Sequence, residues 1–253
     1  MNVKTVVFLG SKPVGYQCFQ YLIEQQKALG YRVIGLLTQK RAEFSGTATL
    51  EVLAAENGIP VLENPADIPE CDLLYSVQYH KLLSGNELSK ARLAVNLHMA
   101  PLPEYRGANQ FSFALLDGKV EFGTTLHVMD TRIDHGDMIA EKRFPIPENC
   151  WVETLYEQTE AASVALFKET LPALISGNFQ LTSQRTLEAT RGTSLHFKAE
   201  MQALKEIPET ADAKTILHTL RATYMPGFEP PFFRTPEGEK IYLVREKDWQ
   251  REG

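Results

Sequence analysis

The sequence predicts an α/β fold, with a Rossmann-like, mainly parallel sheet carrying helices on both faces and a small C-terminal appendage of a helix and a β-hairpin. Two observations predict it. Short apolar runs alternate with longer amphipathic stretches through the first half of the chain, which is typical of βαβ units. These runs are continuously apolar, as expected of strands that are covered on both faces.

The expected elements follow one another along the chain. Strands are predicted at 5–9, 31–38, 59–62, 73–77 and 93–97, with helices at 16–28, 50–56 and 109–116. Residues 121–145 form two extended segments joined by TRIDHG, and 153–176 form the longest helix, which Gly177 ends. The pattern then weakens to a helix at 213–222 and a hairpin at 234–244. We therefore expect a main domain at 1–187 and a helix and hairpin region at 188–253.

Composition narrows the class of protein. The 253 residues carry a net charge of −6, which argues against a protein whose main function is to bind nucleic acid. The three cysteines form no CxxC pair, and the histidines show no metal-ligand spacing. The apolar N-terminal run is too short for a signal peptide, and no stretch reaches the ~18 apolar residues that span a bilayer. We expect a cytoplasmic protein without a metal and without nucleic-acid or membrane partners.

The turn after the first strand matches neither of the common nucleotide-binding sequence motifs. Gly10 and Gly15 enclose Ser-Lys-Pro-Val, which is neither GxGxxG nor a P-loop. A nicotinamide-dependent oxidoreductase is therefore poorly supported. Lys12 could contact a phosphate or simply be solvated.

Three polar side chains have the chemistry of acyl transfer to an amine. Asn96 and His98 end the strand at 93–97 on one face, and Asp134 lies in a glycine-containing turn. The amide or an imidazolium can stabilise an oxyanion, the imidazole can accept the amine's proton, and the carboxylate can orient the imidazole. Taken alone, the Asn-x-His pair also fits a capping asparagine and a hydrogen-bonded histidine. His127, inside a strand pattern, is expected to be structural.

The segment from Asn96 to Ile146 resembles the formyltransferases that use 10-formyltetrahydrofolate. The Asn-x-His pair, the Leu-Pro-x-x-x-Gly loop and the Asp-x-Gly turn beyond a Gly-Thr-Thr strand match in order, and the resemblance spans roughly residues 3–180. It implies that Asn96, His98 and Asp134 are catalytic. It also implies a folate pocket formed by Tyr79, His80, Lys81, Leu82 and Leu83 on one side and Ile133, His135, Gly136 and Asp137 on the other. The family's frequent serine after Asn-x-His-x is replaced by Ala100, which removes any contact of that hydroxyl.

The sequence of the loop from Pro101 to Gln110 and the short C-terminal region are most similar to those of the sugar N-formyltransferases. This branch implies a nucleotide-linked amino dideoxysugar as acceptor, used for cell-surface polysaccharides such as lipopolysaccharide O-antigen. The candidate acceptor contacts are Lys12, Tyr105, Arg106, Asn109, Tyr224, Phe228, Phe232 and Phe233. The tail aromatics could instead pack the tail or form a homodimer contact. A methionyl-tRNA formyltransferase-like enzyme and a non-catalytic folate- or nucleotide-binding module remain the alternatives.

Overall fold

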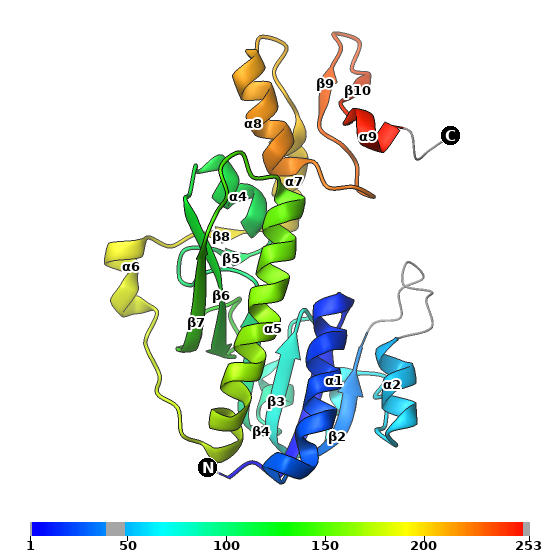
Figure 1. The fold of residues 1–253 in the computed structure, drawn as a ribbon, viewed down its shortest axis with the longest axis vertical. Coiled ribbons are helices and arrows are strands. Elements are labelled where there is room, and N and C mark those ends of the chain that lie inside the picture. Colours follow the sequence, from blue (N-terminus) through cyan, green and yellow to red (C-terminus); the bar gives the residue numbers. More distant parts are fainter. Residues whose placement is uncertain (1, 39–48, 250–253) are drawn as a thin grey trace.

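A six-stranded sheet forms the centre of the computed structural model, which describes residues 2–38 and 49–249. Its spatial order is β2-β1-β3-β4-β6-β7. The strands are β1 (Thr5–Gly10), β2 (Arg32–Leu37), β3 (Cys71–Val77), β4 (Ala91–His98), β6 (Glu121–Val128) and β7 (Met138–Pro145). The first four pair in parallel, and β6 and β7 add antiparallel strands at one edge. The predicted mainly parallel α/β fold is confirmed (Figure 1).

Two long helices cover one face of this sheet. Figure 1 shows α1 (Lys12–Leu29) and α5 (Val152–Ser176) running side by side across it, with α2 (Leu50–Glu56) beside α1. The opposite face is covered by the 3-10 helix η2 (Pro65–Asp67), by α3 (Gly85–Leu88) and by loops. Gly177 ends α5 in a left-handed conformation with φ 75°, as predicted.

The side chains of the strands divide between two cores. Along β1, Val6 and Phe8 pack under α1 and α5, whereas Val7 and Leu9 pack into the cluster on the opposite face. This two-residue alternation on a strand that is buried on both faces explains its continuous apolar run.

Two predicted elements differ in extent from those observed. The first helix begins at Lys12 rather than residue 16, because Pro13 is compatible with the first helical turn. The predicted strand at 59–62 is reduced to an isolated bridge between Leu36 and Val61. Pro60 has no N–H to donate, which limits further pairing there.

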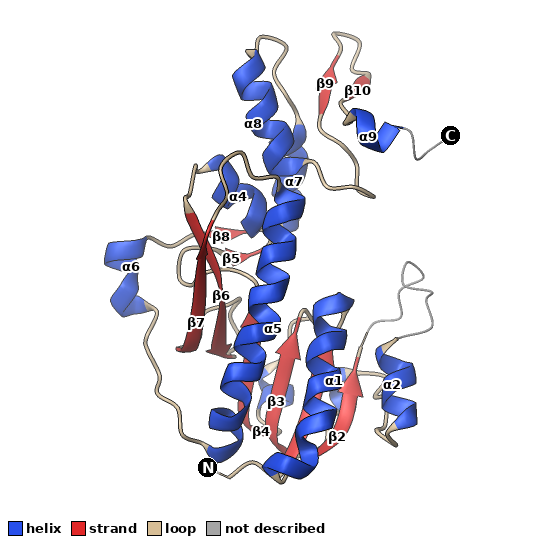
Figure 2. Cartoon of the chain, viewed as in Figure 1, coloured by secondary structure: helices blue, strands red, loops and turns tan. Residues whose placement is uncertain are grey.

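The C-terminal part folds back onto the main sheet's end before it forms a separate hairpin. α6 (Arg185–Arg191) leads to β8 (Leu195–His196), which pairs in parallel with β5 (Arg106–Gly107). After η3 (Lys198–Glu200) and α7 (Met201–Lys205), α8 (Ala213–Thr223) packs on α4 (Gln110–Leu116). β9 (Phe232–Arg234), β10 (Lys240–Tyr242) and α9 (Glu246–Trp249) complete the appendage, apart from the central sheet (Figure 2). Because β8 pairs with β5, close contacts cross the predicted boundary at residue 187.

No helix within 2–38 or 49–249 has both the length and the apolar character needed to cross a membrane.

Candidate active site

The last residues of β4 present an amide and an imidazole at the end of the sheet. Val95 and Leu97 belong to the core under α1 and α5. Because side chains alternate along a strand, Asn96 and His98 project from the other face, as the sequence predicts. The turn after β6 brings Asp134 to the same place.

The carboxylate of Asp134 joins the two residues of β4. Its Oδ1 lies 3.3 Å from Asn96 Nδ2 and 3.4 Å from His127 Nε2. Its Oδ2 accepts a 2.9 Å hydrogen bond from the Gly107 backbone N–H and lies 3.5 Å from His98 Nδ1. The structure therefore brings the three predicted residues together and adds a fourth, His127.

The backbone of Asp134 is held in an unusual conformation. Its φ is 46°, in the left-handed region that non-glycine residues rarely adopt. Gln184 donates two hydrogen bonds from Nε2 to the turn, at 2.9 Å to the carbonyl of Asp134 and 2.8 Å to that of Gly136. A Cβ on Gly136 would lie 1.9 Å from the Val128 carbonyl oxygen, so only glycine fits there. The surrounding structure thus fixes the direction in which the carboxylate points.

Asp134 stays ionised although most of its side chain is shielded from solvent. Burial alone would raise the pKa of its carboxyl, but the positive charges of protonated His98 and His127, with the hydrogen bond from Gly107, hold that pKa well below its usual range. A permanent negative charge therefore lies between two imidazoles at neutral pH.

The tautomer of His98 follows from its partners. Nε2 lies 2.8 Å from the Tyr105 carbonyl oxygen, which can only accept, so Nε2 carries the hydrogen. In the neutral ring, Nδ1 then holds the lone pair, and it faces Asp134. His98 can accept a proton at Nδ1 and pair as an imidazolium with the carboxylate. His98 Nδ1 and Asp134 Oδ2 lie 3.5 Å apart.

Two further residues, His127 and Gln184, contact this cluster. The sequence predicts a structural role for His127, which stays a prediction; in the structure it lies directly opposite Asn96 in the β4–β6 register. Knowing that these strands are antiparallel neighbours would have identified it. Gln184 carries no sequence signal, because it reaches the turn from 50 residues further along the chain.

The predicted folate loop follows β3, and its side chains lie in different environments. Leu82 is 71% exposed and His80 and Lys81 are exposed, whereas Tyr79 is half-buried. Leu83 packs into the second core, so its side chain is a core residue rather than a pocket contact. Across the site, Ile133 and His135 are half-buried and Asp137 is exposed, and His135 Nδ1 lies 2.8 Å from Asp130 Oδ2.

The predicted acceptor residues near the site are placed differently. Tyr105 is buried and its hydroxyl donates to Asp117 at 2.6 Å, so its carbonyl rather than its side chain faces the site. Asn109 donates to the Phe197 carbonyl at 2.8 Å, and Lys12 donates to Gln78 Oε1 at 3.0 Å. Arg106 lies next to Gly107, and its buried Nε has no hydrogen-bond partner among the described residues.

Two of the predicted tail aromatics are core residues of the appendage. Tyr224 is 4% exposed and lies against Trp151 and Arg245, and Phe232 is 1% exposed beneath Lys240. Both side chains therefore fit the alternative that the tail aromatics pack the appendage, because neither ring has an exposed face on which a nucleotide base could stack. Phe233 is half-buried and Phe228 is 70% exposed.

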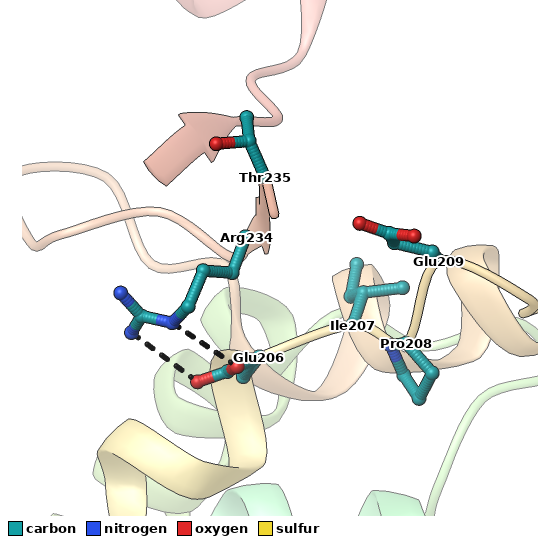
Figure 3. A pocket seen from close by; sticks show the side chains of 6 residues that line it. All are labelled: Glu206, Ile207, Pro208, Glu209, Arg234 and Thr235. Carbon is teal, nitrogen blue, oxygen red and sulfur yellow. Dashed lines mark hydrogen bonds and ion pairs between the residues drawn. The ribbon is translucent and has the colours of Figure 1, made fainter. Parts of the chain in front are cut away.

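A shallow pocket of about 440 Å³ in the appendage contains none of the predicted site residues (Figure 3). It is lined by Glu206, Ile207, Pro208, Glu209, Arg234 and Thr235. Arg234 points to Glu206 and forms a 3.3 Å ion pair with it, so its charge is already matched. Within the ranges that the structure covers, no three His, Cys, Asp or Glu side chains are grouped to hold a metal ion.

Comparisons with known proteins show which proteins this chain resembles. Residues 55–171 match the family model described as formyl transferase. Methionyl-tRNA formyltransferase of Listeria innocua is 28% identical over 262 residues, covering 97% of this chain and 79% of the relative. A 4-N formyltransferase from Francisella tularensis has a TM-score of 0.78 and 19% identity, covering 96% and 97% of the two chains. An N-formyltransferase from Helicobacter canadensis, solved with folinic acid and dTDP-3-aminofucose, has a TM-score of 0.72 and 20% identity, with coverage of 87% and 80%.

Proposed function

The chain belongs to the formyl transferase family and is an N-formyltransferase, and from this premise we propose that it transfers a formyl group from 10-formyltetrahydrofolate to the amine of a nucleotide-linked amino dideoxysugar. The observation that carries the proposal is the convergence of Asn96, His98 and His127 on the Asp134 carboxylate. We place the reaction in the cytoplasm, on the way to a cell-surface polysaccharide such as O-antigen. A homodimer through the C-terminal region remains a prediction.

Solved structures that resemble this chain support a sugar acceptor. The 4-N formyltransferase of Francisella tularensis and the N-formyltransferase of Helicobacter canadensis, solved with dTDP-3-aminofucose, share its fold with TM-scores of 0.78 and 0.72. The described part of the appendage has the single hairpin β9–β10, and the chain's net charge of −6 disfavours a tRNA partner. The 28% identity to the tRNA-specific relative keeps methionyl-tRNA as the second candidate.

The residues around the site fit a folate donor. A pterin is flat and has a hydrogen-bonding edge, so it needs apolar walls and backbone partners. The exposed side chain of Leu82 and the half-buried ring of Tyr79 can supply an apolar wall after β3. The turn from Ile133 to Asp137 supplies the other side. When bound, the donor provides the formyl carbon that the acceptor amine attacks.

Each residue of the cluster then has a task. Asn96 shares the N–H that lies 3.3 Å from Asp134 with the formyl oxygen, where negative charge develops. His98 accepts the amine's proton at Nδ1, because its Nε2 already donates to the Tyr105 carbonyl. Asp134 stabilises the resulting imidazolium, which can return the proton to N10 of the folate as the bond between N10 and the formyl carbon breaks and tetrahydrofolate leaves. The half-buried Arg106 can pair through its guanidinium with the pyrophosphate of the acceptor.

A panel of acceptors tests the proposal. The enzyme and 10-formyltetrahydrofolate are incubated separately with dTDP-, UDP- and GDP-linked 3-amino and 4-amino dideoxysugars, glycinamide ribonucleotide and methionyl-tRNA. Mass spectrometry then detects the added formyl group. We expect a formylated sugar nucleotide. Formylation of methionyl-tRNA alone would overturn the assignment of the acceptor, and no formylation of any amine would support the non-catalytic alternative.

A further inference from the structure

We propose that Ser194 is a positioning residue for His98, because it holds on both sides the residue whose carbonyl orients the imidazole. This inference rests on the proposed function, since it concerns the group that takes the proton of the acceptor amine. Ser194 is half-buried and lies directly before β8, in the C-terminal region. It acts on His98 through the backbone of Tyr105.

The peptide unit between Tyr105 and Arg106 joins His98 to Ser194. Its carbonyl oxygen lies 2.8 Å from His98 Nε2, and its N–H donates to the Ser194 carbonyl at 3.1 Å. A trans peptide unit is planar, so its C=O and its N–H point in opposite directions. The contact with Ser194 therefore fixes the direction of the carbonyl that His98 faces.

The hydroxyl of Ser194 holds the preceding peptide unit. Its Oγ donates to the Glu104 carbonyl at 2.6 Å, while the N–H of the same unit donates from Tyr105 to the Pro101 carbonyl at 3.1 Å. Only the φ and ψ angles of Tyr105 separate this unit from the next one. Ser194 therefore restrains both peptide units that flank the Tyr105 Cα.

The side chain of Tyr105 is anchored separately. It is 3% exposed and packs near Phe122, with the ring centroids 6.0 Å apart, and its hydroxyl donates to Asp117 at 2.6 Å. These contacts determine where Tyr105 lies in the fold. The contacts with Ser194 determine where its carbonyl points.

The direction of this carbonyl matters in both protonation states of His98. A carbonyl oxygen can only accept, and Nε2 carries a hydrogen in the neutral ring and in the imidazolium alike. Because the imidazole is rigid, a rotated carbonyl would turn the whole ring and move Nδ1 relative to Asp134 and the acceptor amine. A misplacement of about 1 Å at a reacting group can cost up to ~10²-fold in rate.

The variants Ser194→Ala and Ser194→Thr test the hydroxyl while keeping the backbone of β8. We expect Ser194→Ala to lower kcat by about 10-fold, with KM within about 2-fold of the wild type, because the proton acceptor is misplaced while the acceptor contacts remain. Ser194→Thr keeps a hydroxyl and should stay within about 3-fold of the wild type. Thr193→Ala, which removes a hydroxyl from the exposed neighbouring residue, is the matched control and should change neither quantity.

Three kinetic outcomes would overturn the inference. The first is an unchanged kcat in Ser194→Ala, and the second is an equal loss in Ser194→Ala and Ser194→Thr. The third is a loss expressed in KM alone, which would mean that Ser194 serves acceptor binding instead.

A measurement without turnover keeps this test apart from the proposed function. The proton NMR signal of the His98 Nε2–H, assigned by its absence in His98→Gln, reports the hydrogen bond to the Tyr105 carbonyl. We expect this proton to exchange faster with water in Ser194→Ala, and to exchange as in the wild type in Ser194→Thr and Thr193→Ala. An unaltered exchange rate in Ser194→Ala would contradict the inference. If the wild-type enzyme formylated no acceptor, the proposed function would fail, whereas this signal would still decide whether Ser194 orients His98.

Discussion

Two clusters of partly buried polar side chains in the described part of the chain differ in the lengths of their contacts. In the arginine clamp (Glu104, Glu141, Arg143 and Arg191), Arg143 lies 2.8 Å from Glu104 and 2.9 Å from Glu141, and Arg191 lies 3.0 Å from Glu141. Around Asp134, the side-chain contacts are 3.3 to 3.5 Å. Short, charge-matched contacts stabilise a fixed structure, whereas longer contacts leave room for a ligand to share donors and protons.

The first way to test this contrast is to remove the loosely matched groups. Asn96→Ala and His98→Ala should each lower kcat by about 10³-fold, or ~4 kcal/mol of transition-state stabilisation, because each removes a group that acts on developing charge or on a proton. Steady-state kinetics on the formylated acceptor would measure the loss. Asn57→Ala, which removes an amide at the end of α2, is the control. Turnover within a few-fold of the wild type would refute the assigned roles.

Breaking the arginine clamp should lower the stability of the fold rather than the rate of the reaction. Arg143→Ala leaves Glu104 without its cation, while Glu141 keeps Arg191, and because the pair is only partly buried we expect a cost of about 2 kcal/mol in the free energy of unfolding. Chemical denaturation would measure this cost. Lys142→Ala removes the neighbouring, more exposed pair with Glu169 and should cost under about 1 kcal/mol. Equal costs for the two variants would mean that the clamp does not differ from a surface pair.

The charge of Asp134 should appear in the pH dependence of stability. Its pKa is lower in the folded protein than in the unfolded chain, so its stabilising contribution is present above the ordinary pKa of about 3.9 and is lost as pH falls toward the folded pKa. Asp134→Asn should therefore lower the free energy of unfolding by roughly 2 kcal/mol at pH 7. The gap should narrow below about pH 4. A gap that widens on acidification would contradict the sign of the shift.

Gln184 should show the smallest effect on stability. Gln184→Ala removes two hydrogen bonds to the turn and should cost about 1 kcal/mol of unfolding free energy. Because the turn directs the Asp134 carboxylate, kcat should also fall, by about 10-fold. Gln17→Ala, which removes one exposed hydrogen bond to Glu160, should change neither quantity measurably. A normal kcat in Gln184→Ala would show that the turn holds its shape without this residue.

Local patterns were sufficient to predict the part of the site that lies on one strand. Asn96 and His98 share a face because β4 alternates, and the run that predicts β4 is easily recognised. The β4–β6 pairing that brings His127 to Asn96 depends on strand order, which a one-dimensional pattern does not contain. The same limit applies to Tyr224 and Phe232. The sequence does not distinguish an aromatic side chain that packs inside the protein from one that stacks on a nucleotide base.

The pairing of β5 with β8 has a consequence for exchanging tails between related enzymes. Gly107, whose N–H holds Asp134, lies in β5, and a Cβ there would lie 2.2 Å from the His196 carbonyl oxygen. Asn109 is tied to the Phe197 carbonyl, and Arg191 reaches back to Glu141. A chimaera joined at residue 187 would therefore replace part of the support of the loop that holds Asp134 with foreign sequence. A junction after Phe197 would carry this support intact and exchange only the helix and hairpin beyond it.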